Sequence, residues 1–402
     1  QGAGRDAVDC FSRAAMQATD RTGEEDERVI EGRNEDAVDM PDDDPVIARR
    51  VLGDDVALEG GEGVDTIAFT ALPDGHEWYA ERVRNHTTTP RLDAAAWRLT
   101  VWGDGLTGGA REFTLADLRR LPSTTRTAFV ECAGNGRSLF GSQQGQAVSG
   151  TAWTLGAIGT ARWRGVRLAE VLRRAGLARG AVDVMPRGLD DDYVTADGTD
   201  LGRVRRPLPL AKALDDVLLA YEMNGEPLPP DHGHPVRVVV PSWIGIASIK
   251  WVGDIEVSTT PLYSPWNTDF YRLFGEHHPA EGSPPLTRQT LKSAFELPWN
   301  ATLRAGARHR LTGRSWSGDG AVTRVDISTD QGGSWRRARL HDVPRRGSWV
   351  RWSTDWRPRT PGPATLLARA TDTTGRSQPT TTAHNTQGYL FDAVVRHPVT
   401  VE

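Results

Sequence analysis

The chain has 402 residues and a mass of 44.0 kDa, which is more than one hydrophobic core usually organises, so two domains are expected. Hydrophobic residues make up 38% and charged residues 25%, the composition of an ordinary globular protein. No run of about 18 uncharged apolar residues occurs, which excludes a membrane-spanning helix. The only two cysteines, Cys10 and Cys132, exclude a disulfide-rich scaffold and any four-cysteine metal site, and no C-x-x-C-H motif for covalent haem is present.

Charge is distributed unevenly along the chain. Residues 1–60 hold 17 acidic and 7 basic residues, which predicts an acidic, solvated N-terminal extension. Residues 61–402 hold 36 acidic and 41 basic residues, an excess too weak for a nucleic-acid-binding surface but compatible with a local anion site. Only three of the 48 basic residues are lysines, so each is a candidate for a specific role: Lys212, Lys250 and Lys292.

Between residues 61 and 275 the pattern alternates between strands and helices, which predicts an α+β domain. WRLTVWGDG (97–105) is typical of a strand entering a turn, and RTAFVECAG (126–134) of an apolar strand that ends in a glycine turn. TLADLRRLP (114–122) and VRLAEVLRRAGLARG (166–180) have the apolar spacing of helices. The stretch at 236–257 contains two β-rich runs separated by Pro241 and Gly245.

From residue 276 to 402 the chain is composed of short alternating strands with Asp, Gly and Pro turns, as in AVTRVDISTDQGGSWRRARL (321–340). This pattern predicts a β-sandwich of immunoglobulin type, without the Cys…Trp…Cys pattern of antibody domains. Five tryptophans are expected in the core or at the rim of this sandwich: Trp316, Trp335, Trp349, Trp352 and Trp356.

The segment FVECAGNGRSLF (129–140) is the sharpest local feature. Cys132 ends an apolar strand, the neighbouring glycines allow close backbone approach, and Arg137 would favour the thiolate. A single cysteine in this position is, on its own, more commonly a small buried apolar residue.

Five segments together resemble successive signatures of the sulfite oxidase family of molybdenum enzymes, in which a pterin dithiolene and one cysteine hold the metal. They are RNHTTTPRLD (84–93), ECAGNGR (131–137), GTAWTLGAIGTARWRGVRL (150–168), AYEMNGEPLPPDHGHPVRVVVP (220–241) and IKWVGDIEV (249–257). The sandwich is similar to the family's C-terminal dimerisation domain. The resemblance therefore implies an acidic extension at 1–60, a molybdopterin-binding catalytic domain at 61–275 and a dimerisation domain at 276–402.

The resemblance also implies the residues of the active site. Cys132 matches the molybdenum ligand, and a thiolate suits a thiophilic metal. Arg84 and Arg137 match arginines that line an anion pocket, and Trp153 matches a tryptophan in the pocket wall. Tyr271 matches a tyrosine beside the substrate because it lies five residues after Trp266, although Tyr263 is an alternative.

A second set of residues matches positions that hold the cofactor's pterin and phosphate. The phosphate positions correspond to His232, Arg237 and Lys250, and the pterin positions to His86 and Asp190. The pair His232 and His234 also suggests zinc, but no third ligand lies at a suitable spacing.

Two features depart from the family pattern. Gly136 precedes Arg137 where animal members carry an arginine, and Gln387 stands where they carry another pocket arginine. No cytochrome b5-like haem domain is expected, so electrons must leave to a separate acceptor.

The implied activity is oxidation of sulfite to sulfate, with electrons passed to an external acceptor such as a c-type cytochrome, by a homodimer. The resemblance favours an extracytoplasmic location. Reduction of nitrate or a sulfoxide at the same molybdenum site is the alternative, and a secreted binding protein without metal is a more remote one.

Overall fold

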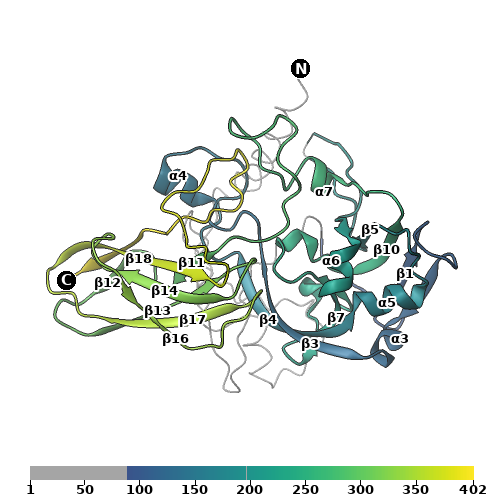
Figure 1. Cartoon of the computed structure of the whole chain (residues 1–402), viewed down its shortest axis with the longest axis horizontal. Helices are drawn as coiled ribbons and strands as arrows, with labels where there is room; N and C mark the ends of the chain where they lie inside the picture. The colour runs from purple at the N-terminus through teal and green to yellow at the C-terminus, as the bar shows by residue number, and fades with distance from the viewer. Residues whose placement is uncertain (1–87, 196) are drawn as a thin grey trace, which may run out of the picture.

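The computed structural model describes residues 88–195 and 197–402. The acidic extension expected at 1–60, and the site residues Arg84 and His86, therefore lie outside the described residues. Figure 1 shows two parts side by side, an α+β part that includes the longest helices and a part composed of strands that ends at the C-terminus.

The α+β part contains two sheets. The first has the strand order β2-β1-β10-β5-β6, and only β1 and β10 in it run parallel. Its strands are β1 (Arg98–Trp102), β2 (Arg111–Thr114), β5 (Asp183–Gly188), β6 (Leu208–Pro209) and β10 (Val252–Ser258). The second has the order β3-β4-β7-β8 with β9 paired to β7, and comprises β3 (Ser123–Glu131), β4 (Ile158–Arg167), β7 (Leu218–Met223), β8 (Glu226–Pro227) and β9 (Arg237–Val239).

Short helices connect these strands: α3 (Leu115–Arg120), α4 (Ser138–Gln144), α5 (Leu168–Ala175), α6 (Leu210–Asp215), α7 (Pro265–Thr268), and the 3-10 turns η1 (Pro230–His232) and η2 (Gly245–Ala247). Thr114 begins α3 with a capping box, in which its hydroxyl accepts from the N–H of Asp117 and the Asp117 carboxylate accepts from the N–H of Thr114. Gly176 ends α5 in the left-handed region at φ 91°, as its place after the apolar periodicity indicates. The strands and helices predicted within 97–134 and 166–180 are confirmed.

The main core of this part lies between the two sheets. Apolar residues of β1 and β10, such as Leu99 and Ile255, pack there with Leu118 of α3, Val171 of α5 and Leu219 of β7. Their burial drives the formation of amphipathic helices as short as α3, which would not be stable alone.

The C-terminal part consists of two sheets around a second core. Their orders are β11-β13-β17-β16 and β12-β19-β18-β14-β15, and no helix occurs in residues 291–402, all of which the structure describes. The strands are β11 (Lys292–Phe295), β12 (Ala301–Leu303), β13 (His309–Trp316), β14 (Val322–Ser328), β15 (Arg336–Arg337), β16 (Arg339–Leu340), β17 (Trp349–Trp356), β18 (Gly362–Asp372) and β19 (His397–Val401). Trp316, Trp349 and Trp352 are buried, while Trp335 and Trp356 lie at the rim, as predicted.

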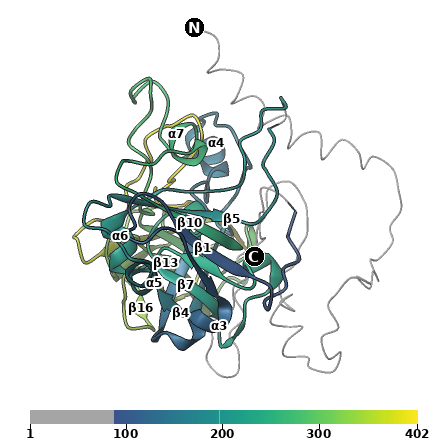
Figure 2. The same ribbon diagram turned by 90° about the vertical axis from the view of Figure 1, so that its right-hand side faces the viewer.

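The two parts share an apolar interface. Phe129 at the end of β3 and Phe140 of α4 pack against Trp316, Trp349 and Phe391 of the C-terminal part. In Figure 2, α4 and α7 lie at the same end of the molecule. The end of β3, where the sequence places its sharpest motif, therefore sits at the junction of the two parts.

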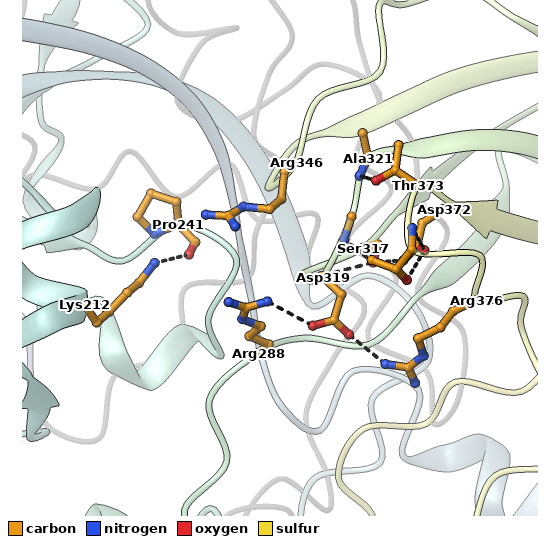
Figure 3. A network of polar contacts seen from close by, with 12 residues as sticks. Lys212, Pro241, Arg288, Ser317, Asp319, Ala321, Arg346, Asp372, Thr373 and Arg376 are labelled. Atoms are coloured by element: carbon orange, nitrogen blue, oxygen red, sulfur yellow. Dashed lines mark hydrogen bonds and ion pairs between the residues drawn. The ribbon is translucent and has the colours of Figure 1, made fainter.

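Polar contacts line another side of the junction (Figure 3). Asp319 accepts hydrogen bonds from Arg288 at 3.3 Å and Arg376 at 2.7 Å, and Arg346 of the C-terminal part lies 3.5 Å from the buried carboxylate of Asp216. Of these contacts, the one between Arg346 and Asp216 joins the two parts. No helix in the described part of the chain is long and apolar enough to cross a membrane.

Candidate active site

Cys132 is the first residue after β3 and is half-buried. Its N–H donates to the carbonyl of Ala157 at 2.9 Å, and the N–H of Gly134 points at its Sγ at 3.4 Å. The strand end and the following turn thus present a sulfur suited to ligating a soft metal.

Arg137 closes the turn and lies over it. A Cβ added at Gly134 or Gly150 would meet the Arg137 guanidinium, so glycine at both positions is what lets the side chain fold back onto the loop. Gly136 has φ 90°, a conformation that other residues rarely adopt. The close approach that Gly134 allows is thus between its backbone and the side chain of Arg137, which belongs to the same motif.

The guanidinium of Arg137 is held by the C-terminal part. Its Nε donates to the carbonyl of Gln387 at 2.8 Å, its Nη1 donates to the carbonyl of Thr151 at 2.8 Å, and its Cζ lies 5.3 Å from the ring centre of Tyr389. Gln387, which stands where animal relatives carry an arginine, is therefore next to Arg137. Its buried Oε1 has no hydrogen-bond partner among the described residues.

Tyr271, rather than its alternative Tyr263, lies beside this pocket. Tyr263 is 65% exposed on the surface, whereas Tyr271 is half-buried and its ring stacks on Tyr389 at 5.3 Å and 8°. Tyr271 has φ 57°, in the left-handed region. Tyr271 and Tyr389 pack in one cluster with Ala133, the neighbour of Cys132.

The backbone of Trp153 is hydrogen-bonded to the end of the cysteine loop, since the N–H of Ser138 donates to the Trp153 carbonyl at 3.0 Å. Its side chain is buried, and its Nε1–H has no acceptor among the described residues. A buried donor without a partner is costly, and a ligand that accepts a hydrogen bond would relieve the cost. The indole N–H of Trp153 is thus a buried donor for a ligand that accepts a hydrogen bond.

The three phosphate-site residues predicted from the resemblance converge at a second position. Gly233, at φ 103°, brings them together, because a Cβ added there would lie 3.0 Å from Arg237 Cβ and 3.1 Å from Lys250 Cα. Arg237 donates to the carbonyl of His232 at 3.1 Å, and Lys250 to that of Asp231 at 2.9 Å. Burial, together with the charges of Arg237 and Lys250, lowers the pKa of His232 to about 3.

Arg237 and Lys250 do not lie at the ends of two adjoining strands. Arg237 begins β9 in the second sheet, whereas Lys250 lies in a bend before β10 of the first sheet and is not within a strand. The two segments are joined outside the sheets by a backbone bond from Val238 to Ile249 at 2.8 Å. Because Lys250 lies in a bend and not in the centre of a strand, its ammonium group stays near the surface and is not buried among apolar residues.

Asp190 lies beside the same cluster. It is buried, and a Cβ added at Gly188 would overlap its carboxylate and lie 3.2 Å from the carbonyl of Lys250. The first described residues also lie here, since Thr88 donates to Asp191 at 3.0 Å and Thr89 to Asp231. Arg84 and His86 are outside the described residues.

The donor set restricts the kind of metal group that fits. Within residues 88–195 and 197–402, no three His, Cys, Asp or Glu side chains gather to hold a metal ion. A metal bound to a pterin dithiolene brings other ligands with it, so a single thiolate such as that of Cys132 would suit it. The cationic cluster around Gly233 suits a phosphate, and the described residues fit such a cofactor.

Comparison with known proteins identifies the family. The family model described as "Oxidoreductase molybdopterin binding domain" matches residues 86–266, and the "Mo-co oxidoreductase dimerisation domain" matches residues 291–402. The sulfite oxidase of Gallus gallus is 36% identical over 332 residues, which cover 77% of this chain and 70% of that protein. The chain belongs to the sulfite oxidase family of molybdopterin oxidoreductases.

Other relatives agree with this assignment. The mitochondrial sulfite oxidase of Homo sapiens is 38% identical over 330 residues, 77% of this chain and 58% of that protein. The chain thus matches only 58% of the length of the human and mouse proteins. The crystal structure of the sulfane dehydrogenase SoxCD from Paracoccus pantotrophus has a TM-score of 0.67 and 27% identity, with 92% of each chain covered.

The candidate site also contains residues that sequence reasoning missed. Tyr389 follows Gln387 by two positions, so the departure noted at Gln387 was a signal that could have led to it. Arg206 lies next to Tyr271, with its Cζ 5.9 Å from the ring centre. No sequence signal distinguishes Arg206, because almost all basic residues of this chain are arginines.

Proposed function

We propose that this enzyme oxidises sulfite to sulfate and passes the two electrons to an external acceptor. The observation that carries the proposal is the grouping of hydrogen-bond donors around the Cys132 loop. Arg137 closes the loop and lies against Tyr389, Tyr271 stacks on the same ring, and Trp153 is bonded to the loop through its carbonyl. Guanidinium, indole and phenol groups all donate hydrogen bonds, and a small oxyanion accepts them. Sulfite and water yield sulfate, two electrons and two protons.

The molybdenum–pterin group, when bound through Cys132, supplies oxygen transfer and accepts the electrons. Arg137, already oriented by the carbonyls of Gln387 and Thr151, binds the anion without having to be ordered first. The unpaired Nε1–H of Trp153 contributes a second fixed donor. Such preorganised donors stabilise charge that develops on oxygen in the transition state.

The cluster of His232, Arg237 and Lys250 would hold the cofactor's phosphate. The lowered pKa of His232 keeps that imidazole neutral at physiological pH, so Arg237 and Lys250 supply the positive charge. Burial keeps Arg237 fixed, since its guanidinium lies 5.0 Å from the ring centre of Trp163 and donates to the carbonyl of Ser248. A fixed cation pairs with a phosphate at little entropic cost.

The C-terminal part would form a homodimer with an immunoglobulin-like sandwich in each subunit. The matching family model, which is named for dimerisation, supports this proposal. Three tryptophans of the sandwich, Trp316, Trp349 and Trp352, are buried within the subunit, so the contact surface would be built from other residues, among them exposed arginines. Sedimentation equilibrium tests the proposal, and a concentration-independent mass of 44 kDa would oppose it.

Reduction of nitrate or a sulfoxide at the same site is the second candidate. Gln387 supports this second candidate, because it leaves the pocket with one positive charge fewer. The loss of that charge weakens the attraction of a dianion such as sulfite more than the attraction of a monoanion such as nitrate. The deciding experiment measures molybdenum content, then sulfite-dependent reduction of a c-type cytochrome against nitrate-dependent oxidation of a reduced dye. Nitrate turnover without sulfite turnover would replace the first proposal.

A further inference from the structure

Arg206 is a buried cation with no counter-ion among the described residues. Its side chain is 1% exposed, and no carboxylate of the described residues lies within ion-pair distance of it. Its Nη1 donates to the carbonyl of Trp266 and its Nη2 to the carbonyl of Leu286 at 2.7 Å, while its buried Nε has no acceptor among the described residues. Burying a charge that is incompletely hydrogen-bonded destabilises a fold, so the presence of Arg206 at this position needs a functional explanation.

The neighbours of Arg206 are the aromatic residues of the active site. Its Cζ lies 5.9 Å from the ring centre of Tyr271, whose ring stacks on Tyr389, and Arg137 lies 5.3 Å from the other aromatic ring. The two tyrosines therefore stand between two guanidinium groups. One of these, Arg137, belongs to the cysteine loop, and the other approaches from the segment before β6.

We propose that the charge of Arg206, which lies against the ring of Tyr271, determines the affinity of this pocket for anions. It would supply the positive charge that is missing where Gln387 replaces the arginine of animal members. The inference rests on the proposed oxyanion function. Arg206 does not touch the substrate; it acts through the field of its charge and through the phenol of Tyr271. Its burial lowers the pKa of the guanidinium to about 10, so the side chain remains positive at neutral pH.

The size of the effect follows from the position of the charge. A unit charge acting over roughly 10 Å at an effective dielectric constant of about 20 changes the binding of an anion by about tenfold per ligand charge. Because no carboxylate of the described residues neutralises Arg206, its field reaches the pocket instead of being cancelled locally. A purely structural role would alter the binding of all anions by the same factor.

The test uses the oxidised holoenzyme and measures the dissociation constants of sulfate and nitrate by calorimetry, alongside KM and kcat for sulfite. Arg206→Gln and Arg206→Met remove the charge, the second with a side chain that tolerates burial, and Arg206→Lys keeps it. Arg205→Gln is the matched control: Arg205 is adjacent and also lies against an aromatic ring, 5.7 Å from that of Trp266, but it is half-buried.

We expect each uncharged variant to weaken sulfate binding at least tenfold and nitrate binding by a smaller factor, and to raise the KM for sulfite more than it lowers kcat. Arg206→Lys should stay within about threefold of the wild type, and Arg205→Gln within about twofold. Equal losses for sulfate and nitrate, or equal effects of Arg205→Gln and Arg206→Gln, would overturn the inference. A wild-type enzyme that binds sulfate but does not oxidise sulfite would instead refute the proposed function, and the sulfate measurements would still decide the role of Arg206.

Discussion

Glu131 and Lys292 form an ion pair at 2.7 Å that joins the two parts of the molecule directly behind the cysteine loop. Their side chains are 0% and 2% exposed. The same carboxylate accepts from Asn135 Nδ2 and Trp316 Nε1, both at 2.9 Å, and Lys292 also donates to the carbonyl of Asn135 at 3.0 Å. The residue that precedes Cys132 is thus fixed by strands of the C-terminal part.

Breaking this ion pair should lower the free energy of unfolding substantially. Lys292→Met leaves the Glu131 carboxylate buried without its cation, and we expect the free energy of unfolding to fall by about 3–5 kcal/mol. Chemical denaturation of the purified protein measures the loss. Arg308→Met, in the exposed pair with Asp355, is the control and should cost less than about 1 kcal/mol. Similar losses for both variants would mean that the buried pair does not stabilise the junction.

The thiol of Cys132 should be indispensable to the metal centre and dispensable to the fold. Cys132→Ser replaces a soft sulfur ligand with a hard hydroxyl of nearly the same size, so turnover should be abolished while the circular dichroism spectrum stays unchanged. Cys10→Ser, outside the described residues, is the matched control and should keep full activity. Near-normal sulfite oxidation by Cys132→Ser would refute the ligand assignment.

Arg137→Gln should weaken substrate binding. A charge-assisted hydrogen bond contributes about 1.5–3 kcal/mol, so kcat/KM for sulfite should fall roughly 10- to 150-fold, mainly through KM. The same range is expected for Arg84→Gln. The control is Arg164→Gln, because Arg164 of β4 forms an exposed ion pair with Glu222 of β7. If the variants at Arg84 and Arg137 both change kcat/KM by less than twofold, the anion binds elsewhere.

Much of the local structure could be predicted from the sequence because it depends on neighbours in the chain. The capping box at Thr114, the glycine after α5 and the glycines around Cys132 all act within a few residues. The rarity of lysine was also informative. Lys212 and Lys292 are paired with Asp216 and Glu131, and Lys250 lies in the cationic cluster.

What could not be predicted depends on contacts between distant segments. Glu131 and Lys292 are 161 positions apart, and nothing local distinguishes a glutamate in a strand that will meet a lysine from one that will face solvent. Arg206 and Tyr389 reach the pocket only because the loop before β6 and the segment after β18 pack on the same turn. Lys250 lies in a bend before β10 although its neighbour Ile249 packs in the core, so the apolar pattern around it does not show where the strand begins.

His397 should make the fold sensitive to acid. Burial lowers its pKa from 6.5 to about 4, while its neutral ring contacts the carbonyl of Pro298 through Nε2 at 3.2 Å. The unfolded chain then binds more protons than the folded one between about pH 6.5 and pH 4, so the free energy of unfolding falls as pH falls through this window. At pH 5 the loss from this group should be about 2 kcal/mol.

Denaturation curves at pH 7 and pH 5 check this expectation. The difference between the two pH values should be smaller in His397→Gln than in the wild type, because glutamine does not titrate. His309→Gln, at a half-buried histidine that contacts the carbonyl of Arg304, should leave the difference unchanged. An unaltered pH dependence in His397→Gln would show that another group is responsible.

Lys250 and Lys212 offer a matched pair of lysines for testing the cofactor anchor. Lys250 lies 4.4 Å from the ring centre of Trp251 and beside Arg237, whereas Lys212 pairs with Asp216 and donates to the carbonyl of Pro241. Lys250→Ala removes one of two cations from the phosphate cluster, so molybdenum occupancy of the purified protein should fall while the loaded fraction keeps nearly normal turnover. Lys212→Ala should lower stability without changing occupancy.

Elemental analysis, together with turnover expressed per molybdenum atom, separates the possible roles of Lys250. A phosphate anchor lies away from the reacting atoms, so its loss changes how much cofactor is retained and leaves the chemistry of each bound cofactor intact. Full occupancy with lost turnover would place Lys250 in the reaction itself. Unchanged occupancy and unchanged turnover would make it a surface residue.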